Sequence, residues 1–252
     1  MKIRINKLLS TAGVCSRREA DRLTDAGRVT ADGVNVATGE KVEERADICI
    51  DGKPIRREEG SVLIAYNKPK GVVCTTTDRY GELDIVTAVG FDKRIYPIGR
   101  LDKDSTGLIM LTNNGTLMNE LTKASGQHEK EYLVKINKKV TEQFLEKMQG
   151  GIYLEELDKN TAKCKARACD ERDIDREIKP GKDGVYDTHT FRIVLIQGLN
   201  RQIRRMCEAC GTRVVALKRI RIMNVLLGDL PEGEYRMVEG AEYEELAKAL
   251  GL

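Results

Sequence analysis

Apolar and polar positions in the first sixty residues follow two different periods. Four apolar residues recur at the spacing of one helix face, and they are Ile5, Leu8, Leu9 and Ala12. Ser16-Arg17-Arg18-Glu19 has the pattern of a capping box, in which Ser16 caps a second helix and Glu19 reaches back to the amide of Ser16. Short alternating strands follow, joined by Asp32-Gly33 and Asp51-Gly52, which are typical of hairpin turns. The pattern predicts a small helix-helix-strand domain over residues 1–60, ending in a polar linker at residues 56–60.

The pattern from residue 61 onward is that of a chain rich in strands. Apolar runs predict strands at residues 62–66, 72–75, 94–98, 108–112, 132–136, 191–196 and 214–227. Helices are expected to start at the caps Thr116, Thr141 and Asn200, and a C-terminal helix is expected near residues 243–250. Residues 155–188 are polar and predict a strand followed by a long loop. The second domain, residues 61–252, is therefore expected to be α+β with a mixed, mainly antiparallel sheet.

Composition narrows the class of protein. A chain of 252 residues with 40% hydrophobic and 33% charged residues can bury a core and is expected to be soluble. No apolar run approaches the roughly 20 residues that span a bilayer, and the N-terminus lacks the apolar stretch of a signal peptide. The seven scattered cysteines fit reduced thiols better than a disulfide framework. We therefore expect a cytoplasmic protein without a membrane partner.

Positive charge is concentrated in two segments, although the net charge is only +3. Residues 1–31 carry a net +4 and residues 199–221 a net +6, whereas residues 32–60 and 222–252 carry −3 and −5. A polyanion that bridges both positive segments would explain this distribution. Either segment taken alone is also explained as an ordinary solvated face.

Two residue patterns invite a chemical reading. Cys207 and Cys210 have the spacing of a zinc-binding pair, but they also continue the apolar helix stripe of Ile203 and Met206, which favours buried thiols. The complementary stripe of the same helix carries Arg201, Arg204 and Arg205, a pattern suited either to phosphate contact or to pairing with a carboxylate. No zinc-protease, P-loop or serine-hydrolase motif is present, so those chemistries are not indicated.

Asp102 lies in a dense loop of glycines and charges between two apolar strands. Loops set on a rigid sheet often carry function, but an aspartate in a loop is more often a turn former or a cap. Spacing alone leaves both readings open.

Several motifs together resemble the RNA pseudouridine synthases that modify ribosomal RNA. Residues 99–108 (GRLDKDSTGL) resemble the catalytic loop of that family, and residues 67–71 (NKPKG) resemble its opening strand and turn. The tyrosine, arginine and closing-strand motifs are matched in order by residues 128–134 (HEKEYLV), 197–206 (QGLNRQIRRM) and 217–222 (LKRIRI). The first domain resembles an S4-type RNA-binding domain. Within the family the chain is most similar to the RluF-like branch, whose members act on the large ribosomal subunit.

The resemblance implies a role for each of several residues. Asp102 would be the essential carboxylate, acting either as a nucleophile at C1′ or as a base at C2′ of the uridine. Arg204 would pair with Asp102, Tyr132 would stack on the flipped base, and Leu217 would pack against the uracil. Arg100 would orient the loop or contact phosphate. The remaining RNA contacts implied in the two positive segments are Arg17, Arg18, Arg201 and Arg205.

The implied reaction isomerises uridine and requires neither a metal nor another cofactor. The implied partner is 23S ribosomal RNA or the assembling large subunit, with tRNA left open as a second substrate and a monomer as the default state. Residues 170–187 are longer than the family pattern and read as an insertion. Two alternatives remain: a non-catalytic S4-type RNA-binding protein, and a zinc-dependent RNA-modifying enzyme built on Cys207 and Cys210.

Overall fold

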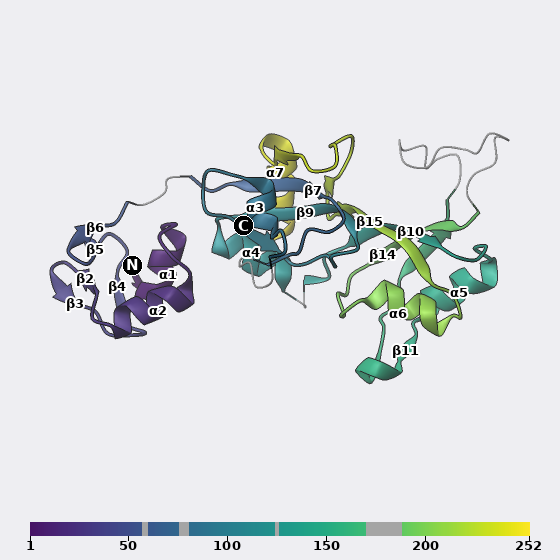
Figure 1. Ribbon diagram of the computed structural model, residues 1–252, viewed down its shortest axis with the longest axis horizontal. Coiled ribbons are helices and arrows are strands. Elements are labelled where there is room, and N and C mark those ends of the chain that lie inside the picture. Colours follow the sequence, from purple (N-terminus) through teal and green to yellow (C-terminus); the bar gives the residue numbers. More distant parts are fainter. Residues whose placement is uncertain (57–59, 76–80, 124–125, 170–187) are drawn as a thin grey trace. The chain divides into compact units, whose positions relative to one another are not determined.

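The computed structural model describes residues 1–56, 60–75, 81–123, 126–169 and 188–252, and the insertion expected at 170–187 lies outside these ranges. Contacts divide the chain into two compact units (Figure 1). The first comprises Met1–Val62 with residues 91–95 and 113–115, and the second comprises the rest. The sequence predicted a single boundary between residues 60 and 61. The contacts instead assign residues 61–62, 91–95 and 113–115 to the first unit as well. Among the described helices, none has the length and apolar character needed to cross a membrane.

The first unit joins two helices to short strands. β1 (Lys2–Arg4) leads into α1 (Ile5–Thr11) and α2 (Arg17–Asp25), followed by β2 (Val29–Ala31), β3 (Val34–Asn35), β4 (Lys41–Glu43), β5 (Ile48–Ile50) and β6 (Lys53–Pro54). The sheet order is β3-β2-β5-β6, and β1 pairs separately with β4. Ile5, Leu9 and Val29 are fully buried between these elements. The expected helix-helix-strand arrangement is confirmed.

Local signals in this unit are mostly confirmed. The Oγ of Ser16 accepts a hydrogen bond from the amide of Glu19 at 3.1 Å, as expected for the cap. The carboxylate of Glu19, however, accepts a bond from Arg22 one turn further on instead of reaching back to Ser16. Both residues of Asp32-Gly33, like those of Asp51-Gly52, have positive φ, which is the backbone that two-residue hairpin turns require.

A nine-stranded mixed sheet forms the centre of the second unit. Its order is β13-β14-β10-β15-β9-β7-β17, with β8 paired to β9 and β16 paired to β15. The strands are β7 (Leu63–Lys68), β8 (Tyr96–Ile98), β9 (Thr106–Thr112), β10 (Lys130–Ile136), β13 (Lys165–Ala168), β14 (Thr190–Leu195), β15 (Val214–Ile222), β16 (Val225–Leu226) and β17 (Tyr235–Met237). Among the described strands of this sheet, β9 and β15 make the one parallel pair. The expected mixed, mainly antiparallel sheet is confirmed.

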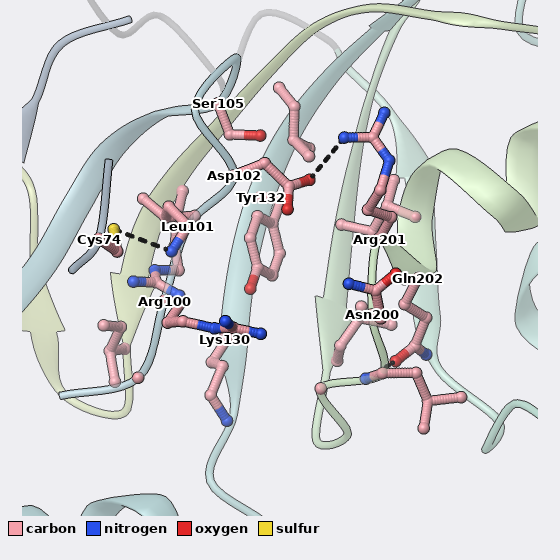
Figure 2. Close-up of a pocket in the computed structure, with 18 of the residues that line it drawn as sticks. Cys74, Arg100, Leu101, Asp102, Ser105, Lys130, Tyr132, Asn200, Arg201 and Gln202 are labelled. Atoms are coloured by element: carbon pink, nitrogen blue, oxygen red, sulfur yellow. Dashed lines mark hydrogen bonds and ion pairs between the residues drawn. The ribbon is translucent and has the colours of Figure 1, made fainter. Parts of the chain in front are cut away.

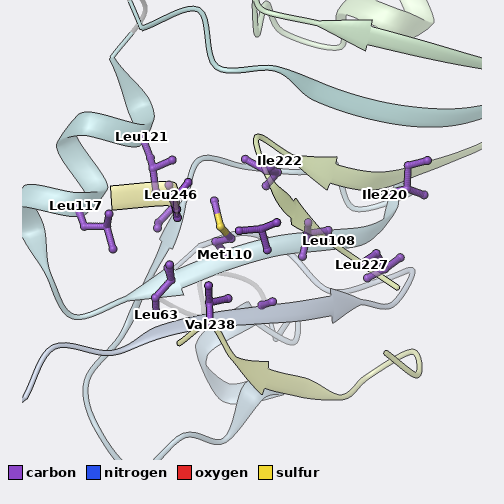
Figure 3. Close-up of a cluster of buried hydrophobic side chains, with 13 residues drawn as sticks. Leu63, Leu108, Met110, Leu117, Leu121, Ile220, Ile222, Leu227, Val238 and Leu246 are labelled. Atoms are coloured by element: carbon purple, nitrogen blue, oxygen red, sulfur yellow. The ribbon is translucent and has the colours of Figure 1, made fainter. Parts of the chain in front are cut away.

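Helices pack on this sheet and bury its apolar side chains. They are α3 (Ile85–Val89), α4 (Gly115–Thr122), α5 (Glu142–Gly150), α6 (Gln202–Ala209) and α7 (Gly240–Ala249), and a small hairpin pairs β11 (Tyr153–Leu154) with β12 (Lys159–Asn160). Leu121 of α4 and Leu246 of α7 lie in one buried cluster with Met110 of β9 (Figure 3). On another part of the sheet, the ring of Phe144 from α5 packs edge to face against the ring of Phe191 on β14. The cap of α5 is Thr141, as predicted, through its bond from the amide of Phe144.

Three further expectations for local structure are wrong. Residues 72–75 form no strand beyond a single bridge of Val73 with Asp84, because the chain there curls around the ammonium of Lys68, which donates to the carbonyl of Val72. Thr116 does not cap α4, since that helix already begins at Gly115. Asn200 does not cap α6, because Arg201 occupies the capping position in a left-handed conformation.

Two backbone irregularities bring the strands of the site together. Gly107 has a φ of +96°, and a Cβ built on it would lie 2.3 Å from the carbonyl oxygen of Arg219. Only glycine therefore permits β9 to approach β15 this closely, which brings the loop before β9 next to β15. Opposite Glu131 and Tyr132 the register shifts by one residue of β15, Ile220, so that Tyr132 lies opposite Arg219.

Candidate active site

A cavity of about 930 Å³ opens in the second unit. Its walls come from the loop between β8 and β9, the start of β10, the loop between β14 and α6, and β15 (Figure 2). Among the described residues the lining carries two acids, Glu82 and Asp102, and seven cations: Arg100, Lys103, Lys123, Lys130, Arg201, Arg204 and Arg219. This excess of positive charge suits a polyanionic ligand.

The loop that carries Asp102 is fixed by backbone contacts on both sides of that residue. The amide of Leu101 donates to the Sγ of Cys74 at 3.3 Å. On the other side, the carbonyl of Lys103 accepts from the amide of Gly71 at 2.9 Å. Burial raises the pKa of Cys74, so its sulfur remains a neutral thiol that accepts this bond. The segment that was expected to be a strand therefore serves as a support for the loop.

Asp102 faces two arginines from the far side of the cavity. Its Oδ2 lies 3.5 Å from the Nη1 of Arg201 and 3.7 Å from the Nε of Arg204. The Nη2 of Arg204 also donates to the hydroxyl of Ser105 at 3.3 Å. The Nε of Arg204 is buried and has no hydrogen-bond partner among the described residues. The expected proximity of Arg204 to Asp102 is present, and Arg201, which was expected to contact RNA, also reaches the carboxylate.

Tyr132 stands beside this ion pair on β10. Its side chain is largely buried, and the guanidinium of Arg219 lies 6.0 Å from the centre of its ring, within reach of a cation–π contact. Figure 2 shows the ring with Asp102 beside it and with Arg100 and Arg201 on opposite sides. Two residues earlier on the same strand, Lys130 also lines the cavity, and burial together with the charge of Arg219 lowers its pKa.

Of the other expected site residues, two line the cavity and three do not. Arg100 and Leu217 line the cavity. Arg205 is not among the lining residues and instead pairs with Glu156 and with the carbonyl of Asn200. Arg17 and Arg18 are exposed at the start of α2 in the first unit.

Sequence reasoning missed several residues of the site. Lys130 and Tyr132 share one face of β10, so the alternation of that strand already indicated Lys130. The sequence could not show that Arg219 lies at the site, because its position opposite Tyr132 depends on the register of β10 with β15. Lys68 and Gln202, both buried, were present in the quoted motifs, but nothing in their spacing indicated burial.

The described residues contain no cluster of three or more metal-binding side chains. Cys207 is fully buried on the apolar face of α6, where burial raises its pKa to about 12. A thiol held neutral in this way is a poor metal ligand, because metals bind the thiolate. Cys207 and Cys210 therefore do not support the zinc reading.

Comparison with known proteins identifies the family of this chain. A family model described as RNA pseudouridylate synthase matches residues 62–209. The chain is 45% identical to the dual-specificity RNA pseudouridine synthase RluF of Escherichia coli K12, over 98% of this chain and 79% of that protein. It is 34% identical to the ribosomal large subunit pseudouridine synthase B of Bacillus subtilis 168, over 96% and 95% of the two chains. A crystal structure of a pseudouridylate synthase matches with a TM-score of 0.66 and 27% identity, over 97% of this chain and 99% of that one. The chain therefore belongs to the RNA pseudouridine synthase family, the enzymes that isomerise uridine in RNA to pseudouridine.

Proposed function

We propose that this enzyme converts a uridine of large-subunit ribosomal RNA to pseudouridine, with Asp102 as its essential carboxylate. The observation that carries the proposal is the position of Asp102, whose Oδ2 lies within 3.7 Å of both Arg201 and Arg204 in a cation-lined cavity. Two guanidinium groups keep a carboxylate oriented and compensate its charge as water is excluded by a bound base.

The chemistry needs only groups that this chain supplies. The N1–C1′ bond of uridine breaks, the base turns, C5 bonds to C1′, the C5 proton leaves and N1 gains a proton. Asp102 either attacks C1′ or removes the C2′ proton to give a glycal, and its place in the cavity suits both roles. Tyr132 provides a buried ring for the base to stack on and a hydroxyl that can accept the C5 proton. Leu217 provides an apolar wall.

The target base must leave its stack to enter this cavity, which costs a few kcal/mol. Contacts of cationic side chains with the RNA backbone offset that cost. Within the second unit, Arg100 and Arg201 are placed for such contacts at the cavity. The first unit is proposed to be an S4-type RNA-binding domain, whose second helix, α2, presents exposed Arg17 and Arg18. Arg205 is proposed as a further phosphate contact beside the cavity.

The choice of RNA rests on the relatives. One is named for the ribosomal large subunit and another for dual specificity, which supports large-subunit RNA as the substrate and a second class of RNA, such as tRNA, as an additional one. A monomer is proposed as the active species. A cytoplasmic location is proposed with it, because ribosomal RNA is the proposed substrate.

The test is release of tritium from RNA labelled at C5 of uridine, comparing the wild-type enzyme with Asp102→Asn. Asp104→Asn is the matched control, because Asp104 lies two residues away in the same loop with an exposed side chain. We expect release by the wild type and by Asp104→Asn but not by Asp102→Asn, with RNA binding retained in all three. Turnover by Asp102→Asn would overturn the assignment of Asp102.

The same assay identifies the substrate. Transcripts of large-subunit RNA, small-subunit RNA and tRNA are compared at equal label, with the assembling large subunit as a fourth sample. Release confined to small-subunit RNA would contradict the proposed substrate. Release from tRNA as well as large-subunit RNA would support dual specificity.

A further inference from the structure

Two glutamines join the loop before α6 to the segment that follows β12. Gln202 is 4% exposed, and its Oε1 accepts a hydrogen bond from the amide of Leu199 at 3.0 Å. Its Nε2 lies 3.5 Å from the Oε1 of Gln197, which in turn accepts from the amide of Ala162 at 2.9 Å. Because the amide of Ala162 can only donate, Gln197 must present its oxygen and Gln202 must present its nitrogen. The orientation of both carboxamides is therefore set by the backbone at each end.

The loop that these groups hold has an unusual backbone. Arg201 has a φ of +51°, a left-handed conformation that residues with a Cβ rarely adopt. Such a conformation persists only where the surroundings over-determine it, and it recurs at functional sites. Within the described residues, the side chain of Arg201 makes no capping hydrogen bond to the amides of α6. The amide of Gln202 bonds back to the carbonyl of Leu199 at 3.2 Å, so that main chain and side chain of Gln202 close the same turn.

The consequence of this turn is the geometry at Asp102. Arg201 immediately precedes Gln202, and its Nη1 lies 3.5 Å from the Oδ2 of Asp102. Arg204 lies two residues after Gln202 on α6 and approaches the same oxygen at 3.7 Å. Gln202 lines the same cavity (Figure 2), and its side-chain hydrogen bonds within the described residues are to Leu199, Gln197 and Met206 rather than to Asp102. A shift of the turn would therefore act on Asp102 through the two guanidinium groups.

We propose that Gln202 is a positioning residue, whose buried carboxamide fixes the turn that places Arg201 and Arg204 on Asp102. The inference rests on the proposed catalytic role of Asp102. A residue that merely fills space here would be apolar, because a buried carboxamide is unfavourable unless its oxygen and nitrogen are both hydrogen-bonded. Gln197 accepts from the amide of Ala162, so the turn is held to the segment after β12 as well as by its own hydrogen bonds.

The experiment uses Gln202→Leu, which keeps the approximate volume but removes every hydrogen bond of the carboxamide, and Gln202→Glu, which keeps the shape. Gln143 on α5 is exposed and supplies matched controls, Gln143→Leu and Gln143→Glu. Single-turnover rate and RNA affinity are measured separately on the full chain. We expect Gln202→Leu to react about 10²-fold more slowly at saturating RNA, because a misplacement of about 1 Å in reacting groups has that effect. Its RNA affinity should fall by no more than the loss of the Arg201 contact explains. The control variants should match the wild type.

The pH profile distinguishes positioning from packing. A protonated carboxyl group has the donor and the acceptor of the amide, whereas an ionised one has no donor. Gln202→Glu should therefore approach the wild-type rate at low pH and slow as the introduced carboxyl ionises, and burial shifts that ionisation upward. Gln143→Glu and the wild type should not show this extra titration.

Three results would overturn the inference: a wild-type rate in Gln202→Leu, a loss of rate in that variant explained by loss of RNA affinity, or a Gln202→Glu profile without the extra titration. If Gln202→Leu does not fold, the pH profile of Gln202→Glu alone decides. Asp102→Asn is assayed in parallel, since its activity would overturn the proposed function itself. An inactive Asp102→Asn beside a fully active Gln202→Leu would overturn only the role of Gln202.

Discussion

The ammonium nitrogen of Lys68 lies 3.5 Å from the carbonyl oxygen of Lys103, the residue that follows Asp102. The same nitrogen donates to the carbonyls of Pro69 and Val72 at 2.8 Å each. Lys68 is fully buried, and burial lowers its pKa. The ammonium group of Lys68 thus contacts three carbonyl groups. Two belong to residues 69–72 and one to the loop of Asp102, so Lys68 links that loop to the turn that supports it.

Lys68→Met should therefore impair both folding and turnover. The substitution leaves buried carbonyl oxygens without a donor, which costs about 1–3 kcal/mol in the free energy of unfolding. It also releases the loop at Lys103, so the single-turnover rate should fall further than the loss of folded protein explains. Denaturant unfolding and single-turnover tritium release measure the two effects.

Lys70→Met is the matched control, because Lys70 is exposed two residues further along the chain. It removes the same charge without touching the loop and should leave both quantities near the wild type. Equal effects of the two substitutions would show that charge, and not the buried contact, matters at this turn.

Signals that act within a few residues predicted the structure well. The caps at Ser16 and Thr141 form as expected because each needs only its own side chain and an amide three residues away. The strand predicted at 72–75 failed because the ammonium of Lys68, four residues before Val72, competes for its carbonyl group. The cap predicted at Asn200 failed because a left-handed Arg201 shortens α6. In both failures a side-chain contact or a local backbone conformation outweighed the apolar or capping pattern.

The candidate site was predictable only where a motif could be compared with a family. No spacing rule relates Asp102 to Arg204, since they lie in different elements and meet through the pairing of β9 with β15. Arg219 reaches the ring of Tyr132 through a register shift that the sequence does not reveal. The family resemblance supplied the first relationship but not the second.

Glu156 restrains an arginine that is proposed to contact RNA. Its carboxylate, which is exposed, pairs with the largely buried guanidinium of Arg205 on α6. Glu156→Gln should free Arg205 for a phosphate, tightening RNA binding and steepening the plot of log affinity against log salt by about one unit. Binding titrations over a series of salt concentrations measure this.

Glu155→Gln provides the control for Glu156→Gln. Glu155 is the exposed neighbour in the same short helix (Glu155–Leu157), and its removal changes the net charge equally. We expect a smaller change in affinity and no change in the salt slope. The same slope in both variants would mean that general charge, not release of Arg205, governs binding.

A network of charges predicts how stability depends on pH. Burial alone would raise the pKa of Glu131, but hydrogen bonds from Arg221 and Arg192 hold it below the ordinary glutamate value of 4.5. Because the folded state binds this proton less tightly than the unfolded chain, the stabilisation is complete above 4.5 and is lost as the pH falls through the lower folded-state pKa.

Glu131→Gln tests this dependence. The variant should lose about 2 kcal/mol of unfolding free energy at neutral pH, a typical value for hydrogen bonds to charged groups. The difference from the wild type should shrink as the pH falls below 4.5. Denaturant unfolding at a series of pH values gives both quantities. A difference that stays constant into acid would contradict the assignment.

Gly107→Ala should disrupt the junction on which the whole site depends. The added methyl group would lie 2.3 Å from the carbonyl oxygen of Arg219, which is backbone and cannot rotate away, and the φ of +96° is itself strained for alanine. Together these effects should lower the unfolding free energy by about 3 kcal/mol. Separation of β9 from β15 would also move Asp102 away from Leu217, so turnover should be lost in the protein that remains folded.

Gly150→Ala is the control for Gly107→Ala, because it makes the same substitution where the added methyl group meets no other atom. Gly150 is the last residue of α5, its φ is not positive, and nothing lies within 4 Å of the added Cβ. Alanine favours a helix over glycine, so this variant should be slightly more stable, by about 0.5 kcal/mol, and fully active. Hydrogen exchange distinguishes the two outcomes, because only Gly107→Ala should expose amides along β9 and β15. Protected amides on both strands in Gly107→Ala would mean that the sheet absorbs the methyl group, and that close approach of these strands is not what positions Asp102.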